Sequence, residues 1–197
     1  MNTTIRNPQS AIRNAKSVRS RERQGGFTLI EAALTSVIIS TGVLAILSAQ
    51  QAFHRKNDWA QRSGTAMLLA NELRELTMTM PKHDPFTGLL TVGPETGETS
   101  VADYDDVDDF AGIITAGYGQ GTTFDPPINA LRQQVDGLPG WSQKIEVASV
   151  LPDNISSTFT QPLGTTDLLR VTVTVLYQSP RDASPRTITT LSWVVGD

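Results

Sequence analysis

A long apolar segment near the amino terminus, from Phe27 to Ser48, constrains this chain more than any other feature. Glu31 is the only ionisable side chain among its 22 residues, and no proline interrupts it. As an α-helix the segment would be roughly 33 Å long, and the hydrocarbon core of a bilayer is about 30 Å thick. The segment can therefore span a membrane. A carboxylate in hydrocarbon costs about 2.5–3.5 kcal/mol on insertion scales, so we expect Glu31 to have a function.

Charge is distributed unevenly on the two sides of this segment's start. Residues 1–26 carry six Lys and Arg and one Glu, a net charge of +5, whereas residues 27–197 carry ten basic and 19 acidic residues, a net charge of −9. A basic leader before an apolar segment predicts a cytoplasmic amino terminus. The acidic remainder argues against nucleic acid as a partner, because phosphate contacts need clustered cations. The chain has no cysteine, which excludes disulfides and thiolate metal sites.

The helical pattern continues beyond the apolar segment and changes character in residues 49–80. Apolar residues recur there every three or four positions and form one stripe, which predicts an amphipathic helix covering a soluble domain. Pro81 should end this helix, and Gly42 and Gly64 are its weakest points. The stripe consists of Ala66, Leu69, Leu73, Leu76 and Met80.

Residues 81–197 contain a loop-rich part followed by predicted strands. Residues 81–140 are rich in Gly and Pro, and we expect a short strand at 89–92 and a flexible glycine loop at 117–121. Residues 145–149, 169–177 and 187–195 alternate between apolar and polar side chains, which is typical of strands, and the last two predict an antiparallel hairpin. The sequence therefore predicts an α+β fold, with a long amino-terminal helix packed on a carboxy-terminal antiparallel sheet.

The run Gly26-Phe27-Thr28-Leu29-Ile30-Glu31, preceded by basic residues and followed by the apolar segment, resembles the type IV prepilin signature. Type IV pilins, minor pilins and the pseudopilins of type II secretion share this signature, and the resemblance covers about residues 19–50. It implies a pilin-like fold with a leader at 1–26, a transmembrane and assembly helix at 27–48, its amphipathic continuation at 49–80, and a domain at 81–197. It also implies a single-pass protein of the inner membrane whose last domain is periplasmic or extracellular.

The same resemblance implies specific roles for the residues around the start of the apolar segment. A prepilin peptidase would cleave after Gly26 and methylate the new amine of Phe27. In the filament, Thr28 and Glu31 would belong to the assembly segment, with the Glu31 carboxylate meeting the Phe27 amine of a neighbouring subunit. The partners implied are the peptidase, other pilin or pseudopilin subunits and the lipid bilayer. Glycine suits the cleavage point because it allows a close approach of the backbone.

Several alternatives remain open from the sequence. An ordinary membrane anchor or a secretory signal peptide would also contain an apolar segment, although neither accounts for Glu31. The absence of cysteine and of a proline between Phe27 and Met80 favours a minor pilin or a pseudopilin over a major filament subunit. A filament-tip module that binds a surface, secreted cargo or nucleic acid is the alternative function. The choice between pilus and secretion system stays open.

An acidic cluster is the most prominent feature of the predicted soluble domain. Oxygen-rich clusters suit Ca²⁺, and major pseudopilins hold calcium in a loop, but the spacing does not match an EF-hand. The alternative is a solvated acidic loop whose Asp side chains cap backbone amides. We therefore assign no metal or cofactor from the sequence and retain calcium as the alternative. The candidate ligands are Asp103, Asp105, Asp106, Asp108 and Asp109.

The remaining polar and aromatic residues do not form a recognisable catalytic motif. His54 and His83 are the only histidines, and neither has a partner set that predicts a triad or a zinc site. We therefore expect the chain to be the substrate of an enzyme and not an enzyme itself. Trp59 is predicted either to anchor the helix at a membrane boundary or to pack on the domain, while Trp141 and Trp193 are predicted in the sheet core.

Overall fold

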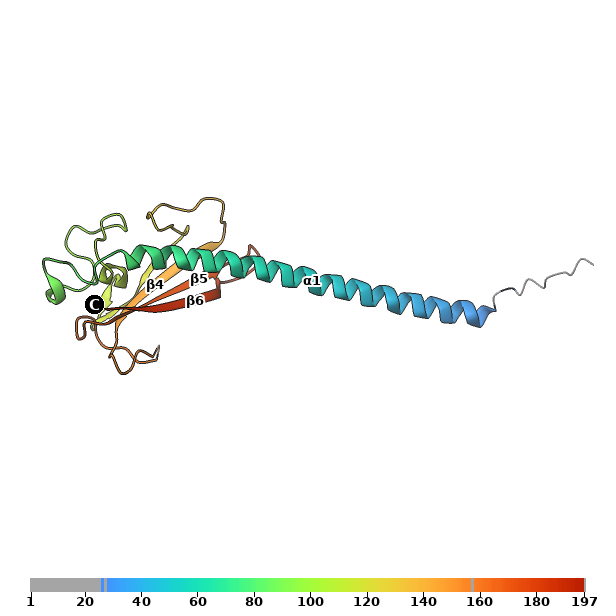
Figure 1. Cartoon of the computed structure of the whole chain (residues 1–197). Coiled ribbons are helices and arrows are strands. Elements are labelled where there is room, and N and C mark those ends of the chain that lie inside the picture. Colours follow the sequence, from blue (N-terminus) through green and yellow to red (C-terminus); the bar gives the residue numbers. More distant parts are fainter. Residues whose placement is uncertain (1–25, 27, 157, 197) are drawn as a thin grey trace, which may run out of the picture. The chain divides into compact units, whose positions relative to one another are not determined.

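The computed structural model describes Gly26, residues 28–156 and residues 158–196, so most of the predicted leader and Phe27 lie outside the described residues. The chain divides into two compact units, residues 1–50 and residues 51–197. A single helix, α1 (Leu29–Met78), contributes residues to both units, and the second unit also contains the sheet (Figure 1). The predicted α+β arrangement of an amino-terminal helix and a carboxy-terminal antiparallel sheet is confirmed.

α1 has a defined start and end that follow from its sequence. The Thr28 hydroxyl oxygen accepts a hydrogen bond from the Glu31 backbone N–H at 3.3 Å, which is the geometry of an N-cap. The helix continues through Gly42 and Gly64 without interruption. It ends at Met78, just before Pro81, whose ring disfavours helical conformation in the preceding residue.

A four-stranded antiparallel sheet forms the centre of the second unit. Its strands lie in the order β3 (Thr122–Phe124), β4 (Trp141–Ser149), β5 (Leu169–Tyr177) and β6 (Arg186–Val195). The predicted hairpin corresponds to β5 and β6, in which Val171 is paired with Trp193. Along β4 every second residue is buried, so the predicted alternation is confirmed there.

The loop-rich part contains more regular structure than its sequence predicts. The predicted strand at 89–92 is wrong, because residues Gly88–Leu90 form a 3₁₀ helix, η1, and a second one, η2, spans Asp108–Ala111. The predicted flexible loop at 117–121 is also wrong, because it includes part of a small hairpin of β1 (Ile114–Thr115) and β2 (Tyr118–Gly119). Gly121 is required there for close packing, since a Cβ at this position would lie 2.4 Å from the Ile145 carbonyl oxygen.

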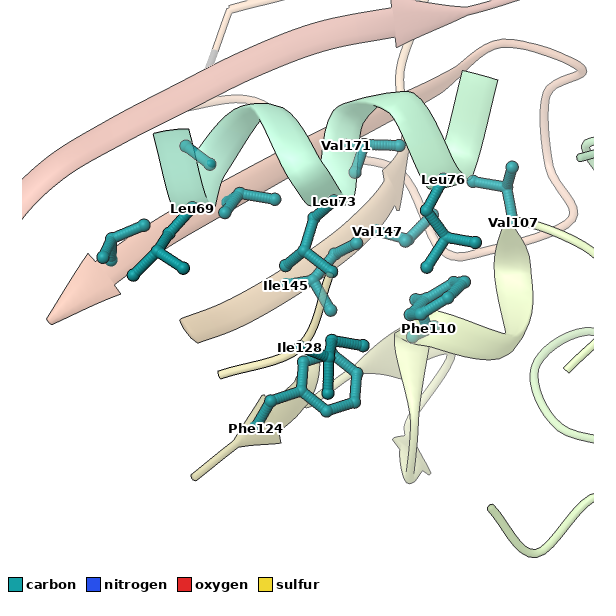
Figure 2. Close-up of a cluster of buried hydrophobic side chains, with 14 of the residues drawn as sticks. Leu69, Leu73, Leu76, Val107, Phe110, Phe124, Ile128, Ile145, Val147 and Val171 are labelled. Carbon is teal, nitrogen blue, oxygen red and sulfur yellow. The ribbon is translucent and has the colours of Figure 1, made fainter. Parts of the chain in front are cut away.

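The core lies between the second half of α1 and one face of the sheet. Figure 2 shows Leu69, Leu73 and Leu76 of α1 facing Ile145 and Val147 of β4, together with Phe110 of η2. Four residues of the predicted stripe are buried and Met80 is half-buried. Trp141 is buried and Trp193 packs against the core, as predicted. Trp59 is 68% exposed, so the alternative that it packs on the domain is wrong.

Gln143 on β4 joins three elements through one buried side chain. Its amide nitrogen donates to the Leu69 carbonyl of α1 at 2.8 Å and to the Ile128 carbonyl at 3.1 Å. Its amide oxygen accepts from the Ile128 backbone N–H at 2.8 Å. The Gln143 side chain is fully buried. Without it, the backbone N–H and carbonyl of Ile128 would lose the hydrogen bonds that satisfy them.

We predict that Gln143→Leu lowers the free energy of unfolding of the second unit by about 2–4 kcal/mol, because leucine leaves the buried N–H and carbonyl of Ile128 unsatisfied. Urea unfolding of the full chain in detergent, followed by tryptophan fluorescence, measures this. Gln133→Leu is the matched control, since Gln133 is exposed and its hydrogen bonds within the described residues involve only its backbone N–H and carbonyl. Equal effects of the two substitutions would contradict the role of Gln143.

Candidate functional site

The first half of α1 is an apolar surface without a partner in the described part of its own unit. Every residue from 28 to 50 is exposed. By length and composition this helix can cross a membrane. The large apolar side chains exposed between residues 29 and 48 are Leu29, Ile30, Leu34, Val37, Ile38, Ile39, Val43, Leu44, Ile46 and Leu47.

The hydroxyl groups of this segment do not make its surface polar. Each of them donates a hydrogen bond to a backbone carbonyl one turn earlier in the helix, at 2.7–3.0 Å. Hydroxyls bonded in this way need no partner in an apolar surrounding. The residues concerned are Thr35, Ser36, Ser40, Thr41 and Ser48.

Three of the four residues assigned to processing and assembly lie together at the start of α1. Gly26 is exposed, and a Cβ there would meet nothing within 4 Å. Thr28 caps the helix through the Glu31 backbone N–H, so its side chain has a structural role at this end. The Glu31 carboxylate lies in the first turn, where the helix dipole favours a negative charge. No side chain of residues 28–156 or 158–196 forms an ion pair with it.

The second candidate site is the acidic cluster at η2. Asp106 Oδ1 accepts hydrogen bonds from the backbone N–H groups of Asp108 at 2.8 Å and of Asp109 at 3.1 Å. Asp109 Oδ2 accepts from the N–H groups of Asp105 at 3.0 Å and of Asp106 at 3.3 Å. The two carboxylates therefore cap the same short stretch of backbone from opposite ends, as the capping alternative predicted.

The expectation of a solvated acidic loop is wrong for three of the five aspartates. Asp106, Asp108 and Asp109 are fully buried, because the apolar residues between and after them, Val107 and Phe110, belong to the core. Apolar burial thus draws the neighbouring carboxylates out of water. Asp103 and Asp105 remain exposed.

Asp103 and Asp108 have partners of their own away from the centre of the cluster. Asp103 caps the preceding turn by accepting from the Ser100 N–H at 3.0 Å, and this hydroxyl-rich turn lowers the pKa of Asp103. Asp108 accepts from the Gly93 N–H at 2.8 Å and contacts His83 Nδ1 through its other oxygen. No local pattern predicts this His–Asp pair, because its members are 25 residues apart in the chain.

Two glutamates that the sequence analysis missed complete the cluster. One carboxylate oxygen from each of Glu95, Asp106 and Asp109 lies within 4.8 Å of the other two, and Glu98, Asp105 and Asp109 form a second such group. These residues could hold a metal ion. Glu95 and Glu98 lie in a turn-rich segment before the aspartates. Their closeness in sequence to the acidic cluster is the only sequence signal that could have indicated them as ligands.

The central carboxylates are electrostatically strained. Burial, reinforced by the charges of Asp108 and Asp109, raises the pKa of Asp106 to about 9. Burial also raises the pKa of Asp109 to about 7, although hydrogen bonds from the backbone of Asp106 oppose the shift. For Glu95, burial and then the adjacent Glu98 raise the pKa to about 7. The folded state therefore holds carboxylates together that would each prefer water or a cation.

Comparisons with protein-family models, with curated proteins and with solved structures find no match to this chain.

We predict that, with chelator present, the second unit becomes more stable as the pH falls from about 9 to about 5. Between the ordinary pKa of these carboxyls and their raised values of about 7 to about 9, the folded state holds protons that the unfolded state has released. Stability is therefore lost as the pH rises through this window. Thermal unfolding of the full chain in EGTA across this range measures the effect.

The same titration on Asp106→Asn provides the control, because this substitution removes the carboxyl with the most strongly raised pKa. Its stability should depend less on pH than that of the wild type. A wild-type stability that rises with pH from about 5 to about 9 would contradict the assignment of a strained carboxylate cluster.

Proposed function

We propose that this chain is a structural assembly subunit, a minor pilin or a pseudopilin, that a prepilin peptidase processes and that packs into a type IV pilus or a type II secretion pseudopilus. The observation that carries the proposal is the first half of α1: an exposed apolar helix whose single carboxylate, Glu31, lies in its first turn. Before assembly, this segment anchors the protein in the inner membrane with its amino terminus in the cytoplasm.

The exposed apolar surface of this helix favours apolar surroundings over water. Residues from Leu29 to Leu47 present large apolar side chains that are about half to nine-tenths exposed. Burying such surface gains about 25 cal/mol per Å², so the helix needs either lipid or other apolar helices around it. A bilayer supplies the first surrounding and a bundle of identical or related helices supplies the second. The same segment thus serves as anchor and as assembly surface.

Glu31 distinguishes an assembly helix from a simple anchor. An anchor gains nothing from a carboxylate in its apolar segment, and the carboxylate costs about 2.5–3.5 kcal/mol in hydrocarbon. Cleavage after Gly26 would create an amine at Phe27, four residues before Glu31. The amine of a neighbouring subunit would neutralise Glu31 and offset this cost, which would fix the axial register of the two helices.

The N-cap at Thr28 fits the same arrangement. Because Thr28 satisfies the Glu31 N–H, α1 starts immediately after the proposed cleavage point and Glu31 is held in the first turn. Thr28 therefore acts on assembly through the position of the helix start. The folded second unit, with its own core, would lie in the periplasm or outside the cell.

We predict that Glu31→Ala leaves cleavage after Gly26 intact but reduces incorporation into filaments at least about tenfold, because the neighbour's amine would be buried without a counter-charge. Cleavage is followed by the mass of the membrane-extracted protein. Incorporation is followed by immunoblotting of sheared filaments, or by cross-linking to other subunits, in cells that carry the machinery.

Asp58→Ala is the matched control, since it removes an exposed carboxylate from α1 outside the apolar segment. This variant should be cleaved and incorporated like the wild type. Normal incorporation of Glu31→Ala would refute the role of Glu31 in assembly.

A further inference from the structure

We propose that Glu95, Asp106 and Asp109 bind one Ca²⁺ ion, which joins the loop that carries Glu95 to the core of the second unit. This inference concerns the folded unit alone and is independent of the proposed assembly function. It rests on the distances between the three carboxylates, on their unpartnered oxygens and on their position next to core residues.

The spacing of the three carboxylates matches a shared calcium ion. Calcium binds oxygen at 2.3–2.6 Å, so two oxygens on one ion lie no further apart than about 5 Å. The ligand oxygens of Glu95, Asp106 and Asp109 all lie within 4.8 Å of one another. Three anionic groups at this separation repel each other strongly unless a cation lies among them.

Unpartnered buried oxygens are the second, independent observation. Asp106 Oδ2 and Asp109 Oδ1 are buried without a hydrogen-bond partner in residues 26, 28–156 and 158–196, and so is Glu95 Oε2. Both aspartates are fully buried, and each uses its other oxygen to accept backbone N–H groups. A buried carboxylate oxygen without a partner is costly, and one ion would satisfy three of them together.

The donor set favours calcium over other divalent ions. All the donors are carboxylate oxygens, which suit hard cations and not zinc or copper. Glu95 is only half-buried, which leaves one side open for water ligands, and calcium accepts six to eight ligands in irregular geometry. Mg²⁺ demands a smaller and near-octahedral shell. Glu98 and Asp105, grouped with Asp109, add negative charge near the site.

The position of the cluster indicates what the ion would do. Asp106 and Asp109 flank Val107, and Asp109 directly precedes Phe110, both of which are fully buried core residues. Glu95 lies on the preceding loop, beyond Gly93, whose N–H is bound by Asp108. An ion shared by Glu95 and the two aspartates would therefore join this loop to the segment that enters the core. Calcium binding should therefore stabilise the folded second unit.

Isothermal titration of the full chain in detergent with CaCl₂, after removal of bound ions by EGTA, tests the proposal directly. We expect one ion bound per chain. At calcium concentrations about 100-fold above Kd, the Tm of the second unit should rise by about 5–10 °C relative to EGTA. MgCl₂ at the same concentration should give a clearly smaller shift.

Asp106→Asn and Asp109→Asn should abolish both the binding and the shift. Asparagine keeps an oxygen that can accept the backbone N–H groups, but it replaces the other carboxylate oxygen with an amide nitrogen that cannot bind calcium. Asp103→Asn is the matched control, since Asp103 lies in the same acidic segment with the same charge but outside both carboxylate groups. It should bind calcium like the wild type.

The absence of calcium binding by the wild-type chain would overturn the proposal, whether or not the variants fold. Binding that persists in Asp106→Asn and Asp109→Asn, or that Asp103→Asn removes equally, would place the ion elsewhere and also overturn it. An equal Tm shift with MgCl₂ would overturn the choice of calcium.

Discussion

The organisation of this protein depends on one constraint. Both halves of α1 carry an apolar surface, and the described chain covers only the one on the second half. The stripe that includes Leu69 and Leu73 packs against β4 and β5, so the second unit has a closed core. The apolar side chains between Leu29 and Leu47 have no such cover among the residues that the structure describes. A bilayer or other helices must supply it, because water would make this surface costly. The proposed assembly function follows from that requirement.

In the second unit, buried polar groups need partners just as the apolar surface of α1 needs cover. Gln143 is tolerated in the core because Leu69 and Ile128 satisfy its amide. Asp106 and Asp109 are only half satisfied, since one oxygen of each is bound by backbone N–H groups and the other is not. A proton or a cation must complete them. The fold therefore favours the addition of a positive charge at this cluster.

Elements with a regular period were predictable from the sequence, and elements built by distant contacts were not. The alternation in 169–177 and 187–195 predicted the hairpin, and the stripe on 66–80 predicted the buried face of α1, because a buried face imposes its period on the sequence. The loop-rich part has no such period. Gly121 looked flexible, yet its small size serves a close approach to Ile145 that no local pattern reveals.

The candidate sites followed the same division. The start of α1 was readable because Gly26, Thr28 and Glu31 lie within six residues and stand out from an apolar background. In the acidic cluster, the five aspartates were visible but their different fates were not. Burial of Val107 and Phe110 decides which of the aspartates lose contact with water, and the fold brings Glu95 to them from an earlier loop of the chain. The pairing of His83 with Asp108 also needed the fold.

The central claim, that this chain is a processed assembly subunit, is tested most directly by the amino-terminal sequence and intact mass of the protein extracted from its native membranes. We predict a chain that starts at Phe27 with a methylated amine, shorter by the 26 residues of the leader. A chain that still starts at Met1 would contradict the claim and leave the apolar segment as a membrane anchor.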